Sequence, residues 1–246
     1  MNLNDKTRAM LGAVSTATLT TQLLKRGYRN IFMQGVRPLL PPPPSLGTAG
    51  GTAGNMVGVA VTLRYIPARE DLATMESLGS REHPQRKTIE TIPAGAVLVM
   101  DCRGEAGVAA AGAILVARMQ ARGAAGLVAD GGIRDAATAA SLGLPIYCAG
   151  PAAPPNVARH LAADMNVPIG CGGVAVFPGD VVVGDGDGVV VIPAALADEV
   201  AAAATEQDRL EDFLLAEIRG GRSLFGVYPP DDATLQRYRS RREPND

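Results

Sequence analysis

Residues 123–135 read GAAGLVADGGIRD, a short apolar run that passes through a glycine-rich turn into Arg134 and Asp135. The apolar residues 126–129 predict a short buried strand. A helix is expected to begin at Arg134 and to end near Gly143, because glycine commonly follows the last turn of a helix. In α/β sheets, ligands collect in the loops just past the strand ends. This loop is therefore the first candidate for a functional site.

The two charged residues after the turn have complementary chemistry. Arg134 offers a planar guanidinium group that can bind a carboxylate through two hydrogen bonds. Asp135 offers a hard oxygen ligand for a divalent cation. The glycines are expected to keep the turn free of side chains, so that a small ligand can approach the backbone. An ordinary helix start with a solvated arginine explains the same pattern, and the residues alone leave both interpretations open.

The rest of the chain alternates between strand and helix patterns, which predicts a layered α/β domain with a mixed sheet. Strands are expected at residues 31–37, 58–65, 97–101, 145–149, 174–177, 181–184 and 189–192. Helices are expected at residues 5–27, 70–79, 107–123 and 194–220. The hydroxyl-rich middle of the first helix indicates either a second helix capped by Ser15 or Thr16, or a hydroxyl that faces a pocket.

The 246 residues suit one domain, 1–246. Within it we expect an N-terminal helical segment at 1–30 and a Pro/Gly-rich insertion at 38–55, where prolines remove hydrogen-bond donors. A polar C-terminal tail at 229–246 is expected to trail over the surface.

Composition narrows the class of protein. The formal net charge is −2, which provides no basic excess for binding a nucleic-acid backbone. No apolar run approaches the roughly 20 residues needed to cross a bilayer, and no signal peptide is visible. We therefore expect a cytoplasmic enzyme with no nucleic-acid partner and no membrane partner.

Cysteine and histidine are too few for a metal site rich in sulfur or nitrogen. Cys102, Cys148 and Cys171 have no metal-ligand spacing and are expected to be small buried residues. The chain has two histidines, with His83 expected in a surface turn and His160 in a helix. A metal would therefore rely on carboxylates and water, which favours Mg²⁺ or Mn²⁺.

Two further segments could carry chemistry. Residues 111–115 read AGAIL, which is either a tightly packed helix or a helix N-terminus that holds a carboxylate oxygen. Residues 177–193 place Asp180, Asp185 and Asp187 in glycine-rich turns, where they are expected to form turns and not to bind a cation.

These three segments, in this order, resemble the family of 4-hydroxy-4-methyl-2-oxoglutarate aldolases and regulators of ribonuclease E activity, the RraA-like family. The most specific element is the glycine-rich run into Arg134 and Asp135. A Gly-acidic-x-Leu element precedes it in the family and reads GAIL from Gly112 here. The Pro-Gly-Asp and Asp-Gly-Val-Val-Val-Ile-Pro segment adds support. The resemblance covers roughly residues 55–221, and the N-terminal helical part also looks similar to longer members.

The resemblance implies a layered α/β/α domain of the swivelling phosphohistidine-like type, assembled as homotrimers or hexamers with active sites at subunit boundaries. It implies that Asp135 is the metal ligand and that Arg134 binds substrate. An acidic residue of the C-terminal helix would reach into a neighbour's site, and Glu211 matches it best. The pyruvyl end of the substrate would be held by Gly112, Ala113, Ile114 and Leu115.

One position departs from the family. Members usually carry Asp or Glu after the glycine that is Gly112 here, whereas this chain has Ala113. In aldolase members that carboxylate helps to hold a water used for proton transfer, and alanine can neither accept nor donate a proton. Either the aldolase chemistry is lost, or Glu211 or another group replaces the carboxylate, or the residue was changed deliberately.

The resulting hypothesis is a metal-dependent aldolase or decarboxylase that acts on a small 2-oxo acid. Metal and Arg134 would stabilise the pyruvate enolate left when the bond beyond C3 breaks. The chain's three lysines, Lys6, Lys25 and Lys87, lie outside the glycine-rich segments, which disfavours a Schiff base. Dehydration of a sugar-derived 2-oxo acid would use the same enolate. The alternative from another class is a protein-binding regulator with a vestigial pocket.

Overall fold

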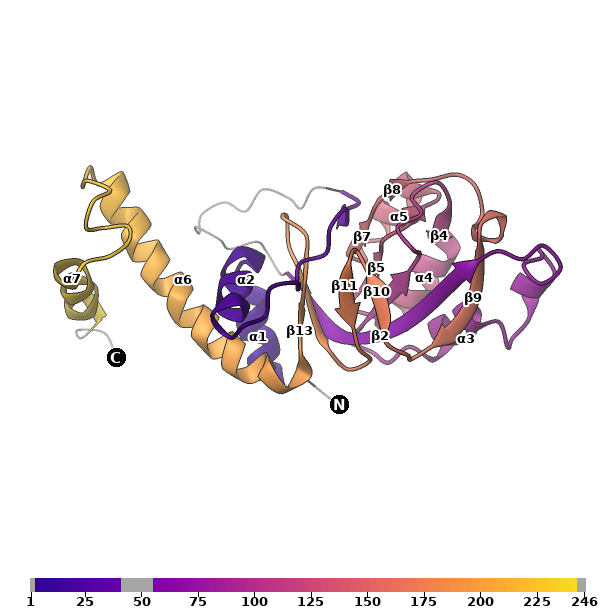
Figure 1. The fold of residues 1–246 in the computed structure, drawn as a ribbon, viewed down its shortest axis with the longest axis horizontal. Coiled ribbons are helices and arrows are strands. Elements are labelled where there is room, and N and C mark those ends of the chain that lie inside the picture. The colour runs from indigo at the N-terminus through magenta and orange to yellow at the C-terminus, as the bar shows by residue number, and fades with distance from the viewer. Residues whose placement is uncertain (1–2, 41–54, 243–246) are drawn as a thin grey trace.

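The computed structural model describes residues 3–40 and 55–242. A mixed eight-stranded sheet forms the centre, in the order β1-β7-β5-β3-β2-β12-β13, with β9 pairing to β2 (Figure 1). The strands are β1 (Arg37–Pro38), β2 (Met56–Pro67), β3 (Ala96–Asp101), β5 (Gly126–Ala129), β7 (Ile146–Cys148), β9 (His160–Met165), β12 (Val181–Gly184) and β13 (Val189–Ile192). The expected mixed α/β fold is thus confirmed.

The centre of this sheet is parallel, and its flanks are antiparallel. Strands β2, β3, β5 and β7 run parallel to one another, whereas β1, β9, β12 and β13 pair antiparallel. Strands β3, β5 and β7 are nearly continuous apolar runs because helices or other strands cover both of their faces. The strands predicted at 97–101, 126–129, 181–184 and 189–192 are confirmed within one residue.

One N-terminal segment almost closes the sheet into a ring. Phe32 forms an antiparallel bridge to Val190 of β13, at one end of the strand order. A few residues later, β1 pairs with β7 at the other end. The strand predicted at 31–37 is therefore divided, since the segment leaves one end of the sheet and joins the other.

Three helices cover the β12–β13 end of the sheet: α1 (Asp5–Ala13), α2 (Thr16–Lys25) and α6 (Ala197–Arg219) (Figure 1). Their apolar faces join β12 and β13 in one core cluster. The side chain of Ser15 accepts a hydrogen bond from Thr18 N and caps α2. The interpretation of a capped second helix within 5–27 is therefore correct, and the alternative holds as well, because Thr16, Thr20 and Thr21 line a second pocket.

Helices α3 (Pro84–Thr91), α4 (Ala113–Ala121) and α5 (Ala136–Ser141) lie at the other end of the molecule (Figure 1). A second sheet consists of three very short parallel strands, β4 (Ala109–Ala111), β6 (Gly132–Ile133) and β8 (Gly150–Pro151). Strands β10 (Ile169–Cys171) and β11 (Val174–Val176) form a separate two-stranded pair.

The C-terminal part of α6 extends away from the sheet, and α7 (Asp232–Arg242) packs beside its far end (Figure 1). The Phe213 and Tyr238 rings lie 5.4 Å apart there, next to the buried Val227. Most of the tail expected to trail over the surface is therefore helical. Of the Pro/Gly-rich insertion at 38–55, residues 41–54 lie outside the described residues. In the part of the chain that the structure describes, none of the helices combines the length and apolar character that crossing a bilayer requires.

Two predicted helices are wrong in whole or in part. The helix expected at 107–123 begins only at Ala113, because Ala109–Ala111 form buried strand β4. Alanine favours helix, but tertiary pairing with β6 overrides that preference. In place of a helix at 70–79 there is only a 3-10 turn at Ser77–Gly79. No residue of 70–79 is buried, so no packing stabilises a helix there.

Both histidine placements are also wrong. His160 begins strand β9 and pairs with Pro67, and it is buried. His83 is buried at the N-cap of α3, a helix that was not predicted. All three cysteines are buried and free, as expected.

Candidate active site

Two short parallel strands bring the site together. Strands β4 and β6 pair in parallel, so their carboxyl ends emerge on the same side. Helix α4 starts directly after β4, and α5 starts directly after β6. Arg134 N donates a hydrogen bond of 3.0 Å to Ala111 O and extends this ladder by one residue. Two segments that are separated in the sequence thus meet at one loop cluster.

The glycines of this cluster make room for protein atoms. A Cβ on Gly112 would lie 2.7 Å from Arg134 Cγ and 3.0 Å from Asp135 Oδ2. A Cβ on Gly131 would lie 2.7 Å from Cys102 Cβ, and one on Gly132 would lie 2.4 Å from Ala152 Cβ. The expectation that the turn glycines leave space for a ligand is wrong for Gly131 and Gly132, because packed side chains already fill that space.

Asp135 has an unusual backbone conformation and an available carboxylate. Its φ is 53° and its ψ is 38°, in the left-handed region that Asp and Asn adopt more readily than other side chains. It occupies the N-cap position of α5, but its side chain makes no capping hydrogen bond. Its Oδ2 lies 3.6 Å from Arg134 Nε, and about half of each side chain is exposed. The pair is therefore open to a ligand.

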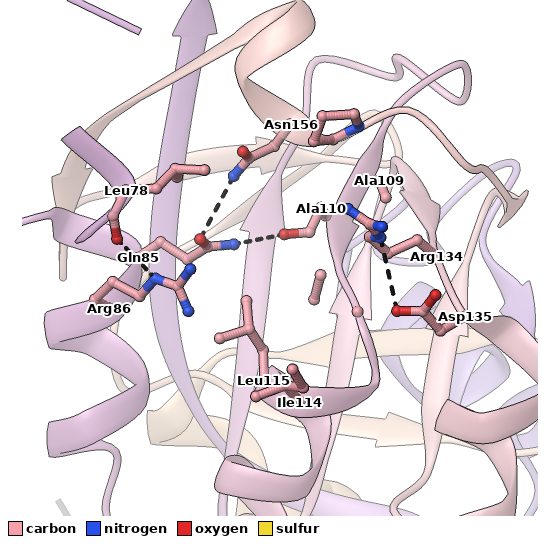
Figure 2. A pocket seen from close by; sticks show the side chains of 13 residues that line it. Leu78, Gln85, Arg86, Ala109, Ala110, Ile114, Leu115, Arg134, Asp135 and Asn156 are labelled. Carbon is pink, nitrogen blue, oxygen red and sulfur yellow. Dashed lines mark hydrogen bonds and ion pairs between the residues drawn. The ribbon is translucent and has the colours of Figure 1, made fainter. Parts of the chain in front are cut away.

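These residues line a pocket of about 280 Å³ (Figure 2). The lining consists of Leu78, Gln85, Arg86, Ala109, Ala110, Ala111, Gly112, Ile114, Leu115, Arg134, Asp135, Pro155 and Asn156. The structure thus brings five of the expected site residues together. Ala113 is not among them, because its methyl group packs against the main core cluster.

The N-terminus of α4 opens onto this pocket. Gly112 O accepts hydrogen bonds from Leu115 N and Val116 N, which begin the helix. The preceding N–H groups, those of Ala113 and Ile114, lie in the first turn, where a helix offers no internal acceptor. Such a helix end attracts anions, so it can hold a carboxylate oxygen.

The opposite wall was missed by sequence reasoning. Gln85 is buried, and its Nε2 donates a hydrogen bond of 2.6 Å to Ala110 O. Asn156 Nδ2 lies 3.5 Å from Gln85 Oε1, and Arg86 Nε donates to Leu78 O over 3.1 Å (Figure 2). Pro84 is the signal that could have revealed this wall, because proline is favoured at the first position of a helix.

A buried aromatic pair lies outside the pocket lining. The rings of Tyr65 and His160 stack with centroids 5.0 Å apart, and His160 Nε2 lies 3.1 Å from Cys102 O. Burial raises the pKa of Tyr65 and lowers the pKa of His160. Burial thus disfavours the charged form of each group, and neither borders the pocket.

Asp130, in the turn after β5, is a structural residue. Its carboxylate accepts hydrogen bonds from three backbone N–H groups, those of Cys102, Gly104 and Gly172. Burial raises the pKa of Asp130, and these hydrogen bonds act in the opposite direction. Asp130 thereby ties three loops together.

The remaining acidic candidates lie elsewhere. Glu211 is exposed on α6, where it accepts a hydrogen bond from Gln207. Helix α6 lies at the end of the molecule away from α4 and α5 (Figure 1). Asp180 accepts from Phe177 N, and Asp185 accepts from Asp187 N, so both form turns as expected.

The side chains available as metal ligands in the pocket suit only some cations. Across residues 3–40 and 55–242, no three His, Cys, Asp or Glu side chains come together to hold a metal ion. Asp135 is the one carboxylate among the described residues that line the pocket. Mg²⁺ commonly binds through one or two carboxylates and keeps several waters or substrate oxygens. The half-exposed Asp135 fits that pattern, whereas a zinc centre would need more protein ligands.

Comparison with curated proteins gives partial matches. A protein of Halalkalibacterium halodurans named "Putative 4-hydroxy-4-methyl-2-oxoglutarate aldolase" is 39% identical over 99 residues, which are 40% of this chain and 47% of that protein. Protein DlpA of Legionella pneumophila is 27% identical over 138 residues, 56% of this chain and 21% of that protein. The chain thus spans less than half the length of these two relatives.

Solved structures match over most of the chain. RraAS2 of Streptomyces coelicolor, described as an unusual member of the RNase ES inhibitor RraA protein family, superposes with a TM-score of 0.72. It is 31% identical, over 87% of this chain and 97% of that chain. An uncharacterized protein of Pseudomonas syringae pv. tomato has the same fold, with a TM-score of 0.78. It is 24% identical, and the match covers 94% of this chain and 96% of that chain.

The family model described as RraA-like, Aldolase/RraA, matches residues 14–191. That range contains both short strands, the N-terminus of α4 and the Arg134–Asp135 pair. The chain therefore belongs to the RraA-like family.

Proposed function

We propose that this chain is a lyase that cleaves a carbon–carbon bond in a small 2-oxo acid, as an aldolase or a decarboxylase. The observation that carries the proposal is that Arg134, Asp135 and the N-terminus of α4 converge on one pocket. The name of the H. halodurans relative supports an aldolase activity.

Each of these groups has a role in holding substrate. The Arg134 guanidinium would bind the carboxylate of the 2-oxo acid, with the free N–H groups of Ala113 and Ile114 as further donors. Asp135 would hold Mg²⁺ or Mn²⁺, which when bound supplies Lewis-acid stabilisation for negative charge that develops on the keto oxygen. The positive charge of Arg134 would stabilise the same developing negative charge on the keto oxygen, because it is already in place before the reaction begins.

Proton transfer needs a group that the described pocket lining lacks. Gln85 and Asn156 are amides, and Ala113 carries no titratable group. We assign this role to Glu211 of a neighbouring copy, since the residue belongs to α6, and α6 lies at the other end of the molecule from α4 and α5 (Figure 1). The proposal therefore includes a homotrimer or hexamer with each site at a subunit boundary.

The test is to incubate the protein with oxaloacetate and Mg²⁺ and to measure pyruvate. Release above the metal-only rate, lost in Asp135→Asn, is the expected result. A folded protein that releases no pyruvate from oxaloacetate or from 4-hydroxy-4-methyl-2-oxoglutarate would contradict the lyase.

A second candidate is a protein-binding regulator that uses the same fold without catalysis. Ala113 favours it, because the pocket carries one carboxylate where the aldolase pattern has two. This candidate predicts a folded protein that binds divalent cations weakly or not at all and that stays inactive when Ala113 is changed to Asp.

A further inference from the structure

Arg86 is a second cation on the pocket wall. It lies on α3, opposite the Arg134–Asp135 pair, with Ile114 and Leu115 between the two sides (Figure 2). Two cations that face one small pocket from opposite sides are costly unless an anion compensates them. The pocket lining thus contains two arginines against one carboxylate, that of Asp135.

Local contacts fix the orientation of Arg86 but leave its charge uncompensated. Its Nε donates to Leu78 O over 3.1 Å, which anchors one edge of the guanidinium plane. Among the described residues, no carboxylate lies within ion-pair distance of it, whereas arginines elsewhere in the described chain do form ion pairs. The pKa of the adjacent His83 is lowered mainly by burial and further by the positive charge of Arg86.

We infer that Arg86 is a specificity-determining residue, which binds an anionic group at the distal end of the substrate while Arg134 holds the carboxylate beside the keto group. The inference rests on the proposed function, because it requires a 2-oxo acid at Arg134. The terminal nitrogens of Arg86 form a planar fork that matches a carboxylate. The apolar side chains of Ile114 and Leu115 suit the short carbon chain between the two ends.

A matched pair of ligands isolates this contact. 2-Oxoglutarate and 2-oxopentanoate have equally long chains, but the second has a methyl group in place of the distal carboxylate. Calorimetry in excess Mg²⁺ should show that the parent protein prefers 2-oxoglutarate. In Arg86→Met that preference should fall by about 10- to 100-fold, which is typical of a lost hydrogen bond between charged groups.

Three variants complete the binding experiment. Arg86→Lys keeps the charge without the fork and should recover part of the preference, whereas Arg86→Gln should not. Arg81→Met removes an exposed arginine that is outside the pocket lining, and should leave the preference unchanged. Thermal unfolding of each variant establishes that it is folded.

Turnover provides the second readout. 4-Hydroxy-2-oxoglutarate and 4-hydroxy-2-oxopentanoate both release pyruvate, so Arg86→Met should raise KM much more for the first than for the second. If neither compound is cleaved, the aldolase form of the proposal fails, while calorimetry still tests Arg86. The inference is overturned if the parent binds the two ligands equally or binds neither, or if Arg86→Met weakens both to the same extent.

Discussion

Gly112 and Arg134 are in direct contact: the space that a Cβ on Gly112 would need lies 2.7 Å from Arg134 Cγ. Any larger residue at position 112 must move the first part of the arginine side chain, which is less free to move than its tip. Asp135 Oδ2 lies 3.0 Å from the same point. The orientation of both charged groups therefore depends on the absence of one methyl group.

Gly112→Ala should reduce kcat/KM for 2-oxo acid cleavage by about 100-fold, because a shift of roughly 1 Å in a positioning group has an effect of that size. Thermal stability should change little, since the residue borders an open pocket. Steady-state kinetics and thermal unfolding check both statements. Gly170→Ala is the control, because a Cβ there has no neighbour within 4 Å. An active Gly112→Ala protein would show that Arg134 can move without loss.

Asp135→Asn should abolish Mg²⁺ and Mn²⁺ binding measured by calorimetry, because the pocket then lacks its carboxylate. Asparagine is the better substitution, since it tolerates the left-handed backbone that Asp135 adopts, whereas alanine adds strain. Asp187→Asn removes an acidic residue of a distant turn and should bind as the wild type does. Unchanged affinity in Asp135→Asn would place the cation elsewhere.

Ala113→Asp should raise the rate of pyruvate release by about ten- to a hundredfold, because a positioned acid or base commonly contributes at least this much. The methyl group of Ala113 contacts the core, but the residue is only partly buried, so the longer Asp side chain would extend from the first turn of α4, where the helix dipole favours a negative charge. Ala113→Asn has a similar shape without the titratable group and should not raise the rate. If Ala113→Asp is no faster than the parent, position 113 is not where an acid–base group is missing.

Strands β3, β5, β12 and β13 of the main sheet could be predicted because they are continuous apolar runs bounded by turn residues. Strand β4 could not, because three alanines carry no alternating pattern and favour helix in isolation. Only its pairing with β6 makes it a strand, and that pairing joins residues distant in the sequence.

The same contrast holds for the site. Arg134 and Asp135 stand next to each other after a recognisable turn, so the sequence indicated them. Gln85 and Arg86 belong to a polar segment without a motif, and they reach the pocket only because α3 packs against β9 and α4. Their role depends on tertiary structure.

The two histidines should make the protein less stable in mild acid. Burial lowers the pKa of both His83 and His160, so the unfolded chain binds protons more readily than the folded one. Their contribution to stability is present above the ordinary histidine pKa of about 6.5 and is lost as the pH falls below it. Denaturant unfolding at about pH 7.5 and about pH 5.5 should therefore give a lower free energy of unfolding at the acidic pH.

His160→Phe isolates one of these contributions. Phenylalanine can still stack on Tyr65 but cannot take up a proton. The difference between the two pH values should be smaller in His160→Phe than in the wild type, whatever its overall stability. The raised pKa of Asp130 acts in the opposite direction in both proteins, so it does not affect this comparison. An equal pH difference in both proteins would exclude His160 as a source.

Subunit mixing tests whether Glu211 acts in a neighbour's site. Asp135→Asn and Glu211→Gln should each be inactive as pure proteins. If one site takes Asp135 from one subunit and Glu211 from the next, random mixed oligomers recover about one quarter of wild-type activity. Mixtures that remain inactive, or an active Glu211→Gln protein, would place both residues in one subunit or exclude Glu211.

The bridge between Phe32 and Val190, and the pairing of β1 with β7, also constrain how the protein is made. A ribosome releases Phe32 early, but its strand partner emerges only after more than half of the chain has followed. Contacts between such distant positions form slowly, because a long loop must close before they add stability. During synthesis the segment at 32–38 therefore has no strand partners until the later part of the chain has emerged. We expect that closure of the sheet by this segment is among the last steps of folding.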